Sequence, residues 1–160
     1  MNITLKNIKH NENLSEETHC FSATVYLDGK AAFGVKNAGH GGADDYYAVR
    51  GGTKYPHELV AEIDNELGKE KVYSGEDGFP PMDNCLEFVV CDLVNDYLTD
   101  KEIKRCLKKV CYAKEGSVYT AKHPATPEAI KAYEAAPWFK EKNCTMLNGL
   151  RIEDVRPFFK

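Results

Sequence analysis

The fold is decided by the stretch CFSATVYLDGKAAFGVK, residues 20–36, which runs directly into the loop Gly39-His40-Gly41-Gly42. Apolar and polar residues alternate on both sides of the central Asp28-Gly29 pair. A period of two is typical of a strand with one buried face, and Asp-Gly between two such runs indicates a tight turn. The stretch therefore predicts an antiparallel β-hairpin. The side chains expected to face the core are Phe21, Ala23, Val25, Phe33 and Val35.

The register of this hairpin depends on the length of its loop. A two-residue turn at Asp28-Gly29 pairs odd-numbered residues with even-numbered ones, which would send the two apolar sets to opposite faces. We therefore predict a three-residue loop, residues 27–29, with its glycine in the left-handed position of a β-bulge. Pairing of Tyr26 with Lys30 would confirm this register, and pairing of Leu27 with Lys30 would contradict it.

The rest of the chain predicts an α+β fold, because strands and helices do not alternate regularly. We expect an N-terminal antiparallel β-hairpin or meander packed with three to four helices and a second, C-terminal hairpin. The length of 160 residues fits a single domain over residues 1–160. The further predicted elements are strands over 2–9 and 44–49, helices that begin at Pro56, after Asp83 and at the capping box Thr99 to Glu102, a loop over 69–81, a hairpin of 110–113 with 118–121 around the three-residue loop 114–116, a helix capped by Thr126, a strand over 144–147 and a terminal helical turn at 152–158.

The overall composition is that of an ordinary folded protein, with a net charge of −4 and a pI of about 5.8. An acidic chain has no general attraction for phosphate, so we expect no direct nucleic-acid partner. The basic segment 101–109 is interpreted as the solvated end of a helix, where cations are favoured. The chain shows neither the apolar segment of a signal peptide nor an apolar run of roughly 18 residues, so we expect no membrane association.

Six cysteines are present, and no two of them form a C-x-x-C pair. In a chain without a signal peptide, free thiols in a reducing cytoplasm are the expected state. The spacing gives no structural zinc site, and we expect no metal and no cofactor.

The strongest candidate for chemistry is the loop His40-Gly41-Gly42 with Asp44 and Asp45. A histidine and two carboxylates can hold a divalent metal or run acid–base chemistry, and glycines let a ligand approach the backbone. However, adjacent residues on a strand point to opposite faces, and no second histidine stands at ligand spacing. Three interpretations stay open, in this order of preference: a tight structural turn, a contact surface, and a metal or catalytic site. We assign no catalytic and no metal-binding residue.

Tyrosines are frequent around this loop, and tyrosine is a common anchor of protein interfaces. The residues that we assign to a candidate binding surface are His40, Gly41, Gly42, Asp44, Asp45, Tyr46, Tyr47 and Tyr55. Acidic residues are dense just beyond them, at Glu58, Glu62, Asp64, Glu66, Glu70, Glu76, Asp77 and Asp83. An acidic and aromatic surface suits a partner with a basic surface, although a solvated helix face accounts for many of the same charges.

Two runs, THCFSATVYLDGK (residues 18–30) and VKNAGHGG (residues 35–42), resemble the opening of small uncharacterised proteins from tailed bacteriophages and prophages. MLNGL, residues 146–150, resembles the ending of the same group, in which an acidic residue is more usual than Gly149. The resemblance implies a phage or mobile-element origin and action in the cytoplasm of a bacterial host. It implies no established active site.

Three hypotheses about function follow. The first, which we favour, is a non-enzymatic accessory protein, monomeric or homodimeric, that binds and inhibits a host or defence-system protein. The second is a small-ligand, nucleotide or metal-binding protein or hydrolase that uses the loop His40 to Asp45. The third is a structural or assembly protein of a virion.

Overall fold

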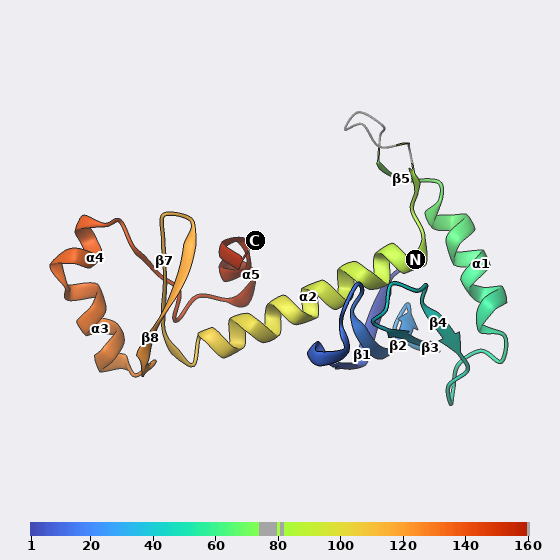
Figure 1. Ribbon diagram of the computed structural model, residues 1–160, viewed down its shortest axis with the longest axis horizontal. Helices are drawn as coiled ribbons and strands as arrows, with labels where there is room; N and C mark the ends of the chain where they lie inside the picture. Colours follow the sequence, from blue (N-terminus) through green and yellow to red (C-terminus); the bar gives the residue numbers. More distant parts are fainter. Residues whose placement is uncertain (74–79, 81, 160) are drawn as a thin grey trace. The chain divides into compact units, whose positions relative to one another are not determined.

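The computed structural model describes residues 1–73, 80 and 82–159 and has the predicted α+β fold (Figure 1). The chain divides into two compact units, Met1–Val94 and Asn95–Lys160, which are described separately. That residues 1–160 form one folded domain stays a prediction.

The first unit is built on a four-stranded antiparallel sheet in the order β1-β2-β3-β4. The predicted strands at the N-terminus, in the hairpin and after the glycine-histidine loop are therefore confirmed. The strands are β1 (Ile3–His10), β2 (Cys20–Leu27), β3 (Lys30–Ala38) and β4 (Asp45–Tyr47), with the short 3-10 helix η1 (Glu12–Leu14) between β1 and β2.

The predicted three-residue loop of the β2–β3 hairpin is wrong. Leu27 pairs with Lys30, so the connection is a two-residue turn. Asp28 and Gly29 have φ of 47° and 81°, and two positive φ values are what a type I′ turn requires. Such a turn matches the right-handed twist of the flanking strands, and aspartate tolerates the left-handed conformation that it needs.

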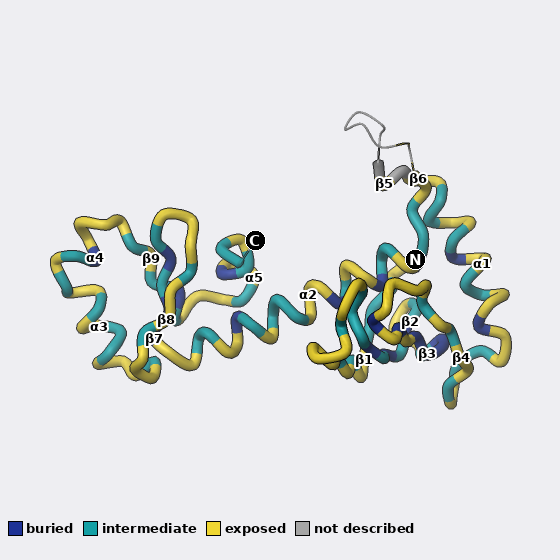
Figure 2. The backbone as a smooth tube through the Cα atoms, viewed as in Figure 1, coloured by how far each residue is buried: buried dark blue, intermediate teal, exposed yellow. Residues whose placement is uncertain are grey.

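A bulge in β3 brings the apolar residues of the two strands onto one face, the role that the prediction gave to a longer loop. Tyr26 pairs with Ala31 and Val25 with Phe33, so Ala32 is the extra residue. The bulge restores the match between odd-numbered residues on both strands. The predicted apolar face is therefore confirmed, and Figure 2 marks buried stretches of the sheet in dark blue. The residues of this face are at most 7% exposed: Phe21, Ala23, Val25, Phe33 and Val35.

Helix α1 (Pro56–Leu67) begins at the proline that the sequence indicated and buries Pro56 and Ile63. The predicted loop 69–81 is only partly a loop, because β5 (Lys71–Tyr73) pairs with β6 (Met82–Asp83). Residues 74–79 and 81 of that segment lie outside the described residues.

Helix α2 (Leu86–Cys106) replaces two predicted helices. The prediction that a new helix starts at Thr99 is wrong, since Thr99 lies within α2. The helix continues through this position because no glycine or proline interrupts the sequence around it. Asp83 lies in β6, and the amide of Leu86 donates instead to Oδ1 of Asp64 at 2.7 Å. Leu86, Val90 and Val94 lie on one side of α2 and are fully buried.

The second unit contains the other sheet, in the order β8-β7-β9, and the predicted C-terminal hairpin is confirmed as β7–β8. Its loop is again shorter than predicted, because Lys114 pairs with Ser117 and leaves the two residues Glu115 and Gly116, with φ of 50° and 77°. Thr126 caps α3 as predicted, through a bond from the amide of Ala129. The elements are β7 (Lys109–Lys114), β8 (Ser117–Pro124), α3 (Pro127–Ala135), α4 (Pro137–Glu141), β9 (Thr145–Met146), α5 (Ile152–Val155) and η2 (Arg156–Phe159), and the core is formed by Ile103, Cys111, Ala113, Leu147 and Val155.

Candidate functional site

The glycine-histidine loop is organised around one buried amide, that of Asn37, which is 8% exposed. Its Nδ2 donates to the carbonyl of Gly42 at 2.8 Å and to Oδ1 of Asp44 at 3.0 Å. Its Oδ1 accepts from Oγ1 of Thr18 at 2.8 Å and from the amide of Gly39 at 2.9 Å. These four bonds use both donors and both lone pairs of the side-chain amide, so Asn37 holds the loop in one conformation.

Gly39 is a structural requirement of the loop. Its φ is +92°, and a Cβ built there would lie 2.0 Å from the carbonyl oxygen of Leu14. The carbonyl of Gly39 accepts from the amides of Glu16, Glu17 and Thr18 at 2.9 to 3.4 Å. The glycine thus joins the end of β3 to the segment that leads into β2, which supports the interpretation of a tight structural turn.

The three residues after Gly39 are exposed. Nδ1 of His40 lies 3.2 Å from Oε2 of Glu16 and forms an ion pair with it when protonated. Gly41 has a φ of +79°, and its amide donates to Oγ1 of Thr18 at 3.3 Å. Gly42 has no positive φ and open space where a Cβ would stand. Nδ1 of His40 and the amide of Gly41 are therefore engaged within the chain.

Asp44 and Asp45 do not act together. Asp44 is half-buried and bound to Asn37, and burial raises the pKa of its carboxyl to about 6, against the opposing effect of that hydrogen bond. The charge of Glu87 raises the pKa further. Asp45 is exposed and pairs with Lys36 at 3.4 Å. Over residues 1–73, 80 and 82–159, no group of three or more His, Cys, Asp or Glu side chains is arranged to hold a metal ion.

The three tyrosines near the loop have different environments. Tyr46 packs edge-on against Phe33 at 5.7 Å and His57 at 6.4 Å, and burial, followed by the charge of Asp44, raises its pKa. Tyr46 is thus part of the packing between sheet and α1. Tyr55 is 65% exposed and directly precedes α1.

Tyr47 lies at the edge of the sheet and is 40% exposed. Its ring covers Gly34 on β3, since a Cβ on Gly34 would stand 2.3 Å from Cζ of the ring. Gly34 therefore makes room for the flat contact that positions Tyr47.

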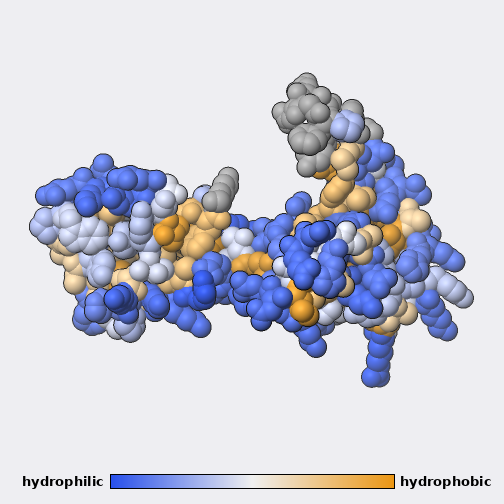
Figure 3. All heavy atoms as spheres, in the orientation of Figure 1, coloured by the Kyte–Doolittle hydropathy of each residue, from blue (hydrophilic) through white to orange (hydrophobic). Residues whose placement is uncertain are grey.

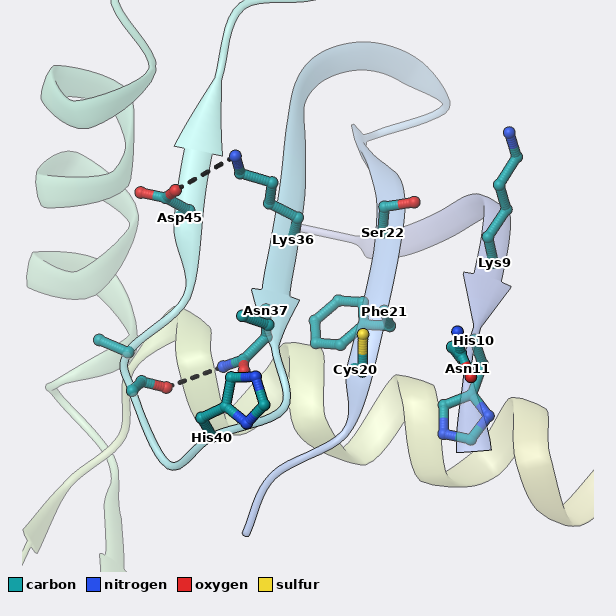
Figure 4. A pocket seen from close by; sticks show the side chains of 13 residues that line it. Lys9, His10, Asn11, Cys20, Phe21, Ser22, Lys36, Asn37, His40 and Asp45 are labelled. Atoms are coloured by element: carbon teal, nitrogen blue, oxygen red, sulfur yellow. Dashed lines mark hydrogen bonds and ion pairs between the residues drawn. The ribbon is translucent and has the colours of Figure 1, made fainter. Parts of the chain in front are cut away.

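A hollow of about 570 Å³ lies where the loop meets the sheet (Figure 4). It brings together three residues of the predicted surface, His40, Gly42 and Asp45, and excludes the tyrosines. The remaining lining residues are Lys9, His10, Asn11, Cys20, Phe21, Ser22, Lys36, Asn37, Ala38 and Ala43.

Four of these side chains form a row across the sheet. Lys9 pairs with Ser22, Ser22 with Lys36, and Lys36 with Asp45, one residue from each strand. Figure 4 shows the four on the same side of the sheet. Sequence reasoning missed Lys9, Ser22 and Lys36, because no pairing of the first strand was predicted and the predicted hairpin register was shifted by two residues. That shift kept each side chain on its face and gave it the wrong neighbour.

No helix in the described part of the chain is long and apolar enough to cross a membrane.

Comparison with known proteins finds no family model, no curated protein and no solved structure that matches the chain.

Proposed function

We propose that this chain is a non-enzymatic accessory protein of phage type that binds and inhibits a host or defence-system protein in the cytoplasm of a bacterial cell. The observation that carries the proposal is the exposure of Tyr55, 65%, at the start of a helix whose exposed side is acidic. Glu58, Glu62 and Glu66 recur every four residues along α1, and all three are exposed. We call Tyr55 with these three glutamates the acidic tyrosine surface.

This arrangement has the chemistry of an interface. A tyrosine ring supplies a large apolar contact with little loss of side-chain freedom, and a phenol can still bond at the rim. Carboxylates along the same helix attract a basic surface and speed its approach. Those of Glu58 and Glu62 supply this charge, since Glu66 is paired with Lys69. In the face shown in Figure 3, hydrophilic side chains predominate around α1, with smaller apolar patches. The partner that fits is a protein with a basic surface, such as one that itself binds nucleic acid.

The bonding of the glycine-histidine loop argues against the rival hypothesis of a ligand site there. Asn37 is fully hydrogen-bonded, and His40 is paired with Glu16. Because Asn37 is buried and its side-chain amide is fully used, it must break internal bonds before it can hold a ligand. The loop is therefore assigned a scaffold role in the proposed function.

Co-purification from a bacterial host lysate tests the proposal, with the wild type, Tyr55→Ala and His40→Ala compared. We expect one stoichiometric partner that Tyr55→Ala loses and His40→Ala retains. Metal analysis and nucleotide binding are measured on the same preparations. Loss of binding in His40→Ala, together with a bound metal or nucleotide in the wild type, would replace the proposal with the ligand-site alternative.

A further inference from the structure

The strands of the first sheet have a charge balance opposite to that of the whole chain. β1 to β4 contain four lysines, Lys6, Lys9, Lys30 and Lys36, and one acidic residue, Asp45. The whole chain has a formal net charge of −4. The expectation of no nucleic-acid partner was based on that total, and it does not describe the sheet.

Three of these lysines share the side of the sheet opposite to Phe21, Ala23 and Val25, which we call the open face. The strand pairing places the side chains of this face in two neighbouring rows. Within each row, successive residues belong to adjacent strands, which lie about 4.8 Å apart. The rows are Lys9, Ser22, Lys36 and Asp45, and Lys6, Thr24, Gly34 and Tyr47.

The side chains of these rows are accessible. Lys36 has a side chain that is 56% exposed. Lys6 and Lys9 are exposed. The hydroxyl-bearing Ser22, between Lys9 and Lys36, and Thr24, next to Lys6, are at intermediate burial. The one carboxylate, Asp45, pairs with Lys36, so the four charged groups leave a surplus of two positive charges.

Aromatic rings stand among the lysines. Tyr47 lies over Gly34 with one side of its ring against the backbone, and the residue is 40% exposed. Nζ of Lys6 lies 4.3 Å from the ring centroid of Tyr26, which pairs with Ala31 on the same face. Lysines and hydroxyls for phosphates, next to an exposed ring for a base, form the combination that binds unpaired nucleotides.

We infer that the open face binds single-stranded nucleic acid. Lys6, Lys9 and Lys36 contact successive phosphates, and one base stacks on Tyr47. The hollow beside Lys9 and Lys36 has a volume of about 570 Å³, within the range of sites for nucleotide-sized ligands. A duplex offers no free base to Tyr47, so single strands are preferred. This inference goes beyond the proposed function and uses a different surface.

Fluorescence anisotropy with a labelled 15-nucleotide oligo(dT) or oligo(rU) tests the inference. If three lysines neutralise phosphates, binding weakens about 20-fold between 50 and 200 mM salt. We expect Lys9→Gln/Lys36→Gln to weaken binding at least about 10-fold and to flatten this salt dependence. The control Lys122→Gln/Lys142→Gln changes the formal net charge from −4 by the same amount, at exposed residues of the second unit, and is expected to bind as the wild type does.

Substitution of Tyr47 distinguishes the binding of nucleic acid from the binding of any polyanion. We expect Tyr47→Leu to weaken oligonucleotide binding about 10-fold and Tyr47→Phe, which keeps the ring, to bind as the wild type does. Circular dichroism of both variants checks that the sheet is folded.

Four outcomes would overturn the inference. The first is that the wild type does not bind the oligonucleotide at 50 mM salt, and the second is that both glutamine double variants lose affinity equally. The third is that the wild type binds heparin as tightly as the oligonucleotide and Tyr47→Leu has no effect. The fourth is that an equimolar mononucleotide competes completely, which would indicate that the hollow binds a free nucleotide.

Discussion

Gly39 and Gly42 belong to the same loop and differ in what a methyl group would meet. At Gly39 it would lie 2.0 Å from a backbone oxygen at a φ of +92°, whereas at Gly42 nothing lies within 4 Å. We predict that Gly39→Ala lowers the free energy of unfolding by about 3 kcal/mol or more, because left-handed strain and a clash with immovable backbone add. Gly42→Ala is expected to change it by less than about 0.5 kcal/mol. Urea unfolding of both variants measures this, and similar effects would contradict the scaffold role of Gly39.

Asp44 gives the loop a pH dependence. Its pKa is about 6 in the folded protein and ordinarily near 3.8, so between these values the folded state binds more protons than the unfolded state. The contribution of this group to stability therefore falls as the pH rises through that window. Asp44→Asn keeps an oxygen that accepts from Asn37 and removes the charge.

We predict that Asp44→Asn is about 1 kcal/mol more stable than the wild type at pH 7, a figure reduced for the solvent screening of a half-exposed group. The difference should vanish near pH 4. Urea unfolding of both proteins from pH 4 to pH 7 measures it. If the variant is less stable at pH 7, or if the difference does not change with pH, then the buried charge of Asp44 does not destabilise the folded protein.

At the scale of elements, α2 allows a direct test of where a helix begins. Thr99 lies inside α2, whereas Thr126 caps α3 with a bond from the amide of Ala129 at 3.2 Å. Loss of a capping threonine costs about 1 kcal/mol, whereas alanine inside a helix is favoured over threonine by about 0.5 kcal/mol. We predict that Thr126→Ala destabilises the protein and that Thr99→Ala leaves it equal or more stable in thermal unfolding. A loss at Thr99 as large as that at Thr126 would contradict a continuous helix.

The hairpin shows what alternation in a sequence can and cannot predict. Alternation identified Phe21, Val25 and Phe33 as one buried face, because burying them together is a strong energetic requirement. The same requirement is met by a three-residue loop or by a two-residue turn with a bulge at Ala32. Local sequence does not distinguish these solutions, since the tight turn gains from strand twist and the bulge from the packing of the whole sheet.

The same limit applies to the candidate site. The glycine-histidine loop was visible because glycine and histidine are conspicuous, but its central residue, Asn37, is an ordinary polar residue within a strand. Its importance comes from four bonds that join Thr18, which precedes β2, to the loop that follows β3. The row Lys9, Ser22 and Lys36 likewise depends on pairings between three strands. The excess of lysine in the strands was readable from the sequence once strand boundaries were known.

At the scale of the whole molecule, charge is unevenly distributed between two surfaces of the first unit. The open face carries Lys6, Lys9 and Lys36, while the acidic tyrosine surface carries glutamates of α1. The proposed protein partner therefore needs a basic surface to bind at α1, whereas the inferred nucleic acid brings negative charge to the open face. A partner with a basic surface would bind at α1 and be insensitive to substitutions on the open face.

The measurement that tests the central claim most directly is quantitative capture of the host partner by a charge-reversed acidic tyrosine surface. Glu58→Lys/Glu62→Lys is compared with the wild type and with Glu134→Lys/Glu141→Lys, which reverses two exposed glutamates of the second unit. We predict that the first pair loses the partner by at least about 10-fold, with the loss largest at low salt, and that the second pair captures it as the wild type does. Equal capture by both pairs, or no stoichiometric partner for the wild type, would contradict the claim that this protein acts by binding through α1.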